Sequence, residues 1–134
     1  VRRADWSVPT TDTEAIAAKP GNFGLWQLKD GLSAQVGIPG VSVPVITTDV
    51  SAIAPGWHHV ALTYDGAAYI LWLDGVQKAA GVASGNLGGG FEPLGIGGQP
   101  AAFGSAFATT HFSGDLADVR LYGQALSAAQ LQSL

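Results

Sequence analysis

Cysteine and methionine are both missing from this 134-residue sequence. Without cysteine the chain can form no disulfide framework and no thiolate metal site. Without an initiator methionine, we expect the chain to be a processed or excised piece of a longer protein. No apolar run reaches the roughly 18 residues of a membrane-spanning helix, and no signal peptide is recognisable, so membrane insertion is not expected.

Charge is also scarce. Charged residues make up 12% of the sequence, with only 6 Lys and Arg and a net charge of −4. A basic patch for a phosphate backbone is therefore not available, and nucleic acid is not an expected partner. Hydrophobic residues reach 47%, which is typical of a packed chain. The length suits a single domain over residues 1–134 that buries roughly two thirds of its unfolded surface.

Glycine is abundant, with 19 residues beside 7 prolines, and it punctuates many short apolar or alternating stretches. These stretches predict strands, and only the C-terminal residues 126–134 predict a helix, with Ser127 as N-cap and Gln130 completing a capping box. Pro44 cannot donate to a ladder, so its strand is expected to be an edge strand or to break there. The pattern indicates an all-β sandwich or jelly roll. The predicted strands are 14–19, 23–31, 32–38, 41–50, 57–64, 68–73, 76–80, 93–98 and 112–123.

The stretch GWHHVALTYDGAAYILWLDGVQ (56–77) could hold a site or only turns. Asp65-Gly66 and Asp74-Gly75 fall at the two joints between its predicted strands. Asp and Gly tolerate the positive φ that tight hairpin turns require, so we interpret both pairs as turns. His58 and His59 are neighbours on a strand and point to opposite faces, whereas a two-histidine metal site on a strand needs spacing i, i+2.

Residues 56–133 resemble the laminin-G-like, concanavalin A-like jelly-roll domains of bacterial and phage proteins. The resemblance is carried by GWHHVALTYDG, LWLDGVQ, LGIGG and FSGDLADVRLYGQALSAAQLQSL. It implies a concanavalin A-like β-sandwich of two antiparallel sheets. The matching positions are Trp57, His59, Val60, Ala61, Asp74, Gly75, Ile96, Gly97, Gly114, Asp118, Val119, Arg120, Tyr122, Ala125, Leu126 and Ser127.

Two departures from that family pattern stand out. Val1-Arg2-Arg3 resembles the tail of the family's first aromatic strand, so this first strand is expected to be missing or supplied from elsewhere. The chain is also rich in Ala and Gly where relatives are more polar, so the family's sugar-binding residues cannot be transferred one by one.

Catalysis is not predicted. Family glucanases carry a Glu-x-Asp-x-Glu triplet, and glycoside hydrolysis needs two carboxyl groups flanking the scissile bond. Here the only two glutamates, Glu14 and Glu92, are far apart in sequence. Asp115 and Asp118 lie three apart and face opposite sides of a strand. His111 stands alone, and no Ser-His-Asp arrangement is recognisable.

Asp118 and Arg120 lie two apart on one predicted strand face, which favours a structural role, either as an ion pair or through a hydrogen bond to the helix cap region. The alternative comes from relatives that hold Ca²⁺ near the sheet rim, and it makes Asp12 and Asp118 candidate ligands. No other cofactor is expected.

The predicted ligand surface combines aromatic faces with polar side chains on loops or on the sheet. Core packing is the alternative for Trp26 and Trp72, because both lie in predicted strands. Phe103 and Phe107, in a loop rich in Gly and Ala, could instead cover a sheet edge or contact a neighbouring domain or subunit. The candidates are Trp26, Trp72, Asn86, Gln99, Phe103, Phe107 and His111.

These observations lead to two functional hypotheses. The first is a non-catalytic carbohydrate-binding or adhesion module of an extracellular, cell-surface or virion protein, with a glycan as partner. The second is a structural assembly module of a virion, fibre or surface layer, with a neighbouring protein subunit or domain as partner and no sugar specificity.

Overall fold

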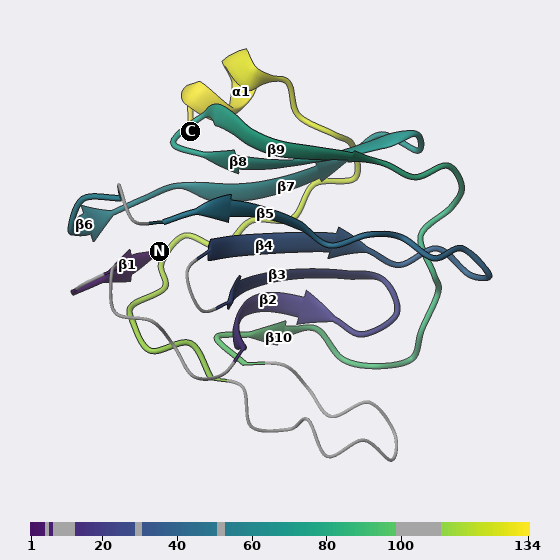
Figure 1. Ribbon diagram of the computed structural model, residues 1–134, viewed down its shortest axis with the longest axis horizontal. Helices are drawn as coiled ribbons and strands as arrows, with labels where there is room; N and C mark the ends of the chain where they lie inside the picture. The colour runs from purple at the N-terminus through teal and green to yellow at the C-terminus, as the bar shows by residue number, and fades with distance from the viewer. Residues whose placement is uncertain (5, 7–12, 29–30, 51–52, 99–110) are drawn as a thin grey trace.

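A computed structural model of the chain describes residues 1–134 apart from 5, 7–12, 29–30, 51–52 and 99–110 (Figure 1). Its strands form two main antiparallel sheets that face each other, and one short helix lies at the C-terminal end. The elements are β1 (Arg2–Arg3), β2 (Glu14–Lys19), β3 (Phe23–Leu28), β4 (Gly31–Val36), β5 (Ile46–Asp49), β6 (Gly56–Trp57), β7 (Val60–Tyr64), β8 (Ala68–Leu73), β9 (Val76–Val82), β10 (Gly95–Ile96) and α1 (Ala128–Gln132).

The larger sheet has the order β10-β2-β3-β4-β5. Its central hairpin pairs Leu25 with Ala34 and Trp26 with Ser33. Because side chains alternate along a strand, Leu25 and Ala34 face the core, whereas Trp26 and Ser33 face the opposite side. The strand predicted at 41–50 is shortened to β5 at the edge of this sheet, as Pro44 indicated.

The smaller sheet is the meander β7-β8-β9. Its register pairs Leu62 with Leu71 and Tyr64 with Tyr69, and all four side chains pack in or against the core. Tyr69 is fully buried, and its hydroxyl donates a hydrogen bond to the Pro44 carbonyl at 2.6 Å. This bond joins the smaller sheet to the segment that leads into β5.

Both predicted Asp-Gly turns are present. Asp74 and Gly75 have φ of 52° and 70°, as a tight hairpin requires, and Gly66 has φ of 95°. Asp65 accepts hydrogen bonds from the backbone N–H groups of Ala67 and Ala68. The helix is shorter than predicted, but the Ser127 capping box is confirmed.

The prediction of a last strand over 112–123 is wrong for most of its length. Only Asp115 forms a bridge, antiparallel to Arg2, and no strand is assigned from residue 116 to residue 122. Asp118 also has φ of 54°, which interrupts an extended conformation. The alternating sequence is compatible with a strand, but a strand also needs a hydrogen-bonded neighbour.

Candidate functional site

A hollow of about 460 Å³ lies beside the β3–β4 hairpin and has Trp26 in its wall. We call it the Trp26 hollow. Its volume is within the roughly 300–1,000 Å³ of small-molecule sites. It is lined by Ala18, Pro20, Gly21, Asn22, Phe23, Gly24, Trp26, Gln35, Val36, Gly37, Ile38, Pro39, Val41 and Val43.

Trp26 is placed by the glycine two residues before it on the same face of β3. A methyl group on Gly24 would overlap Cζ2 of the Trp26 ring. The indole therefore lies across the backbone of Gly24 instead of standing away from the sheet. Trp26 is only half-buried, so part of this aromatic surface borders the hollow.

The polar side chains of the Trp26 hollow are amides. Gln35 lies opposite Gly24 on β4 and donates a hydrogen bond from Nε2 to the Val43 carbonyl. Asn22, at the β2–β3 turn, donates from Nδ2 to the Gly88 carbonyl. No Asp, Glu, Lys or Arg is among the lining residues, so the hollow suits a neutral ligand with an apolar face and hydroxyl groups.

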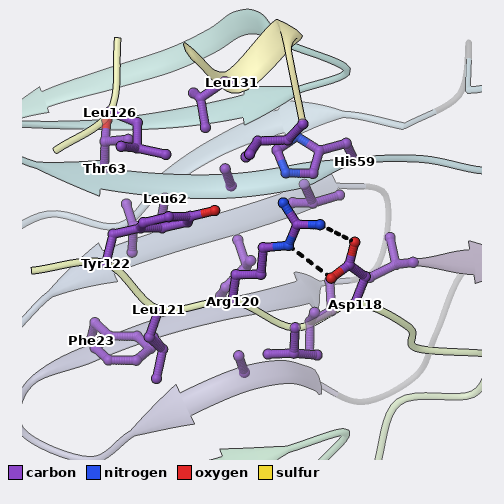
Figure 2. A pocket seen from close by; sticks show the side chains of 18 of the residues that line it. Phe23, His59, Leu62, Thr63, Asp118, Arg120, Leu121, Tyr122, Leu126 and Leu131 are labelled. Atoms are coloured by element: carbon purple, nitrogen blue, oxygen red, sulfur yellow. Dashed lines mark hydrogen bonds and ion pairs between the residues drawn. The ribbon is translucent and has the colours of Figure 1, made fainter. Parts of the chain in front are cut away.

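A second and larger space, about 940 Å³, opens between β7 and the segment 116–126 (Figure 2). We call it the β7 groove; its floor includes Ile16, Phe23 and Leu25 from the larger sheet. Figure 2 shows Asp118 and Arg120, both on this segment, paired with each other beside the groove, with Nη2 of Arg120 2.7 Å from Oδ2 of Asp118. The hydrogen bonds from Arg120 hold the pKa of Asp118 below its usual value, and this pairing raises the pKa of Arg120.

The other sequence-predicted ligand residues do not join Trp26 in its hollow. Trp72 is buried, and its Nε1 donates to Thr63 at 2.9 Å, which agrees with core packing. Asn86 and His111 are exposed and line neither space, while the backbone of His111 bridges to Ala15 and Gly98. Gln99, Phe103 and Phe107 lie outside the described residues.

The carboxylates of Glu14 and Asp118 are engaged in structural contacts. Glu14 is buried and accepts hydrogen bonds from Arg3 at 3.2 Å and from the Ser113 backbone at 3.0 Å. Asp118, a candidate Ca²⁺ ligand, is paired with Arg120, and Asp12 lies outside the described residues. Within the described ranges, no group of three or more His, Cys, Asp or Glu residues has the geometry to hold a metal ion.

His58 lies between two acceptors. Its Nδ1 is 2.8 Å from Oδ2 of Asp74, and its Nε2 is 2.8 Å from the Ala54 carbonyl. The other oxygen of Asp74 accepts the backbone N–H of His59 at 2.9 Å. Asp74 thus has a structural role beyond its turn, since it ties the β8–β9 turn to the segment before β7.

Gly24, Gln35 and Asn22 were not predicted from the sequence as neighbours of Trp26. The signal for Gly24 is its spacing in FGLW, because a glycine two residues before a tryptophan on a strand leaves room for the ring. The position of Gln35 beside Gly24 follows only from the register of the β3–β4 hairpin. The side chain of Asn22 is held beside the hollow by its hydrogen bond to the Gly88 carbonyl, and this contact between distant segments cannot be predicted from local sequence.

A family model described as "Concanavalin A-like lectin/glucanases superfamily" matches residues 4–132. No curated protein matches the sequence. The chain is similar to the crystal structure of an S-layer domain-containing protein (residues 221-444) from Clostridium thermocellum ATCC 27405, with 20% sequence identity and a TM-score of 0.46. That similarity covers 92% of this chain and 63% of that one, so the chain spans less than two thirds of that structure. No helix in the described residues is long and apolar enough to cross a membrane.

Proposed function

Since the chain belongs to the concanavalin A-like lectin/glucanase superfamily, we propose that it is a non-catalytic carbohydrate-binding or adhesion module with its ligand site in the Trp26 hollow. One observation carries this proposal: the half-buried Trp26 ring lies across Gly24 in the wall of an uncharged hollow. The superfamily also contains glucanases, so the family alone does not decide between binding and hydrolysis.

The lining chemistry favours a neutral saccharide. An aromatic side chain combines a large apolar surface with a defined plane, against which the C–H face of a sugar ring can pack. The amides of Asn22 and Gln35 offer donors and acceptors to hydroxyl groups at its edge. An acidic or phosphorylated ligand would find no cationic side chain among the lining residues.

The proposal assigns no catalytic residue and no required cofactor. The carboxylate of Glu14 is buried in an ion pair with Arg3, away from the hollow. Binding of Ca²⁺ by Asp12 and Asp118 is the alternative, and the experiment below tests it by comparing glycan binding with and without Ca²⁺. The module is proposed to act outside the cell, on a cell surface or on a virion, as part of a larger protein.

A glycan array run on the chain with and without Ca²⁺ tests the proposal. We expect saturable binding to neutral glycans, unchanged by a chelator. Trp26→Ala should weaken it about 30-fold, as truncating a central aromatic contact does. Trp57→Ala is the matched control, because Trp57 is exposed but lies outside the Trp26 hollow. Equal losses in both variants, or binding that survives Trp26→Ala, would contradict the proposed site.

A structural assembly module is the second candidate, and it is favoured by exposed apolar side chains. Phe91 is fully exposed and Val82 is 83% exposed. Side chains of this kind mark contacts with other proteins when they gather in a patch. If the folded chain binds no glycan, and Phe91→Ser abolishes a self-association seen by analytical ultracentrifugation, the assembly function replaces the carbohydrate one.

A further inference from the structure

The Trp26 hollow lies at the end of the molecule where β2 turns into β3 and where β4 ends. Figure 1 shows the 83–94 segment running along this same end. The Gly88 N–H donates to the Gly37 carbonyl at 2.8 Å, and Nδ2 of Asn22 donates to the Gly88 carbonyl. The 83–94 segment is therefore hydrogen-bonded directly to residues that line the hollow.

Phe91 is held in place on both sides within this segment. Nζ of Lys19, the last residue of β2, donates to the carbonyl of Gly90 at 3.0 Å and to the carbonyl of Glu92 at 2.6 Å. Between these two fixed carbonyls, the phenyl ring of Phe91 is fully exposed. The ring is thus presented from an ordered backbone, which lowers the entropic cost of docking it on another surface.

Other exposed apolar side chains surround Phe91 at this end. Among the large hydrophobic side chains of the described residues, the two most exposed are Phe91 and Val82, at the end of β9. Val41, Val45 and Leu87 are exposed here as well, and Val41 also borders the hollow. Exposed apolar side chains that gather in one place mark a contact with another protein, whereas single ones do not.

The Trp26 hollow has the size and the chemistry to receive a phenyl ring. An apolar cavity of about 150 Å³ holds benzene, and the hollow measures about 460 Å³. Its wall combines the Trp26 ring with Ile38, Val41 and Val43, and a second aromatic ring can pack against Trp26 by its edge or by an offset face. The chain does not fill the hollow with its own Phe91, which is exposed and is not among the lining residues.

The charges at this end fit a second copy of the same chain. Residues 19–24, 35–43 and 83–94 contain one cation, Lys19, and one anion, Glu92. Two such ends can meet without an excess of one charge, although the whole chain carries −4. Phe91 and the hollow also lie at the same end, as a closed two-fold dimer requires, because each copy must offer both features to its partner.

We infer that two copies of this chain associate end to end about a two-fold axis, with Phe91 of each copy seated against Trp26 in the hollow of the other. The inference goes beyond an assembly function in general, because it names the surface that receives Phe91. In one respect it rests on the proposed function: the same hollow is the proposed saccharide site, so dimerisation and glycan binding exclude each other.

Sedimentation velocity of the chain between about 1 μM and about 1 mM tests the association, a range that suits a small interface. We expect a monomer–dimer equilibrium whose Kd rises about 30-fold or more in Phe91→Ser, as for a central aromatic contact. Val76→Ser is the matched control, because Val76 is exposed at the opposite end of β9, and it should leave the Kd unchanged. A monomer at every concentration, growth beyond a dimer, or equal losses in both variants would overturn the inference.

A complementation experiment tests which surface receives Phe91. Val41→Asp places a carboxylate in the wall of the hollow at an exposed position, so the variant should fold but not dimerise. Phe91→Ser should not dimerise either. Mixed together, with one variant fluorescently labelled, the two should form a heterodimer, because one copy keeps Phe91 and the other keeps an intact hollow. If the two Phe91 rings instead contacted each other, the mixture would stay monomeric, and that result would overturn the inference.

Glycan binding separates this inference from the proposed function. At protein concentrations where the parent chain is dimeric, monomeric Phe91→Ser should bind array glycans more tightly than the parent does. If Phe91→Ser binds no glycan while the parent dimerises through the hollow, the saccharide site is wrong and the dimer stands. If the dimeric parent and Phe91→Ser bind glycans equally well, the shared use of the hollow is overturned.

Discussion

At the scale of single residues, Tyr69 links the two halves of the sandwich through one hydroxyl. The ring is fully buried over Gly81, and the hydroxyl donates to the Pro44 carbonyl. Burial raises the pKa of Tyr69, so the phenol remains a donor at all ordinary pH values.

Tyr69→Phe should therefore keep the packing and remove only the hydrogen bond. We expect a loss of about 1 kcal/mol in the free energy of unfolding, the usual net value of such a bond. Urea denaturation followed by tryptophan fluorescence measures it. Tyr122→Phe is the control, because Tyr122 is 48% exposed, and it should change stability by less than about 0.5 kcal/mol. Equal effects in both variants would contradict a linking role for Tyr69.

Asp74 should make stability depend on pH. Burial alone would raise the pKa of its carboxyl, but hydrogen bonds from the His58 side chain and the His59 backbone, with the charges of both histidines, hold it below 3.8. A depressed folded-state pKa gives stability that is fully present above the unfolded value of 3.8 and is lost as pH falls through the folded value.

We therefore expect the urea midpoint to fall as the pH is lowered from about 5 through about 4 and below. Asp74→Asn tolerates the same positive φ, and it should make the midpoint less dependent on pH in this window while lowering it at neutral pH. Some dependence will remain, because backbone hydrogen bonds to Asp65 and the pair with Arg120 at Asp118 also lower those pKa values. A slope identical to that of the parent would show that Asp74 contributes nothing.

At the scale of elements, the hairpin β8–β9 depends on a glycine that has two independent requirements. Gly75 has φ of 70°, and a methyl group there would collide with Cγ of Gln132. Gln132 in turn donates from Nε2 to the Gly75 carbonyl at 3.2 Å. The turn thus fixes both its own hairpin and the position of α1.

Gly75→Ala should cost about 1–3 kcal/mol, because the side chain strains a positive φ and displaces Gln132. Gly89→Ala is the matched control, since Gly89 has open space around its Cα and no positive φ. Differential scanning calorimetry should show a clear fall in Tm for the first variant and almost none for the second. Similar Tm values would mean that the turn adapts and that α1 moves with it.

Local chemistry explains which elements the sequence could predict. The turns at Asp65 and Asp74 and the cap at Ser127 were recognisable because each depends on residues within a few positions of one another. The prediction of a strand at 112–123 was wrong because a strand needs backbone hydrogen bonds to a neighbouring strand that is distant in sequence, and local sequence does not show whether that neighbour is present. Trp26 was named as a candidate, but its hollow depends on the β3–β4 register, which brings Gln35 beside Gly24.

At the scale of the whole molecule, one buried ion pair joins three segments that are far apart in sequence. Arg3 of β1 and Glu14 of β2 have side chains only 9% and 11% exposed, and Glu14 also accepts the backbone N–H of Ser113. The pair therefore holds both β1 and the start of the 112–126 segment against the larger sheet. This ion pair was not predicted from the sequence, because no local pattern connects positions 3, 14 and 113.

Glu14→Gln should cost about 3 kcal/mol, because it leaves the Arg3 guanidinium buried without a countercharge. Arg3→Met in the same chain should recover most of that loss, since Met fills similar space without charge and the introduced amide can still accept the backbone N–H of Ser113. A double-mutant cycle from urea denaturation gives the coupling, expected above about 1 kcal/mol. Additive losses would show that the two side chains act separately. In that case β1 would be held mainly by its pairing with β6.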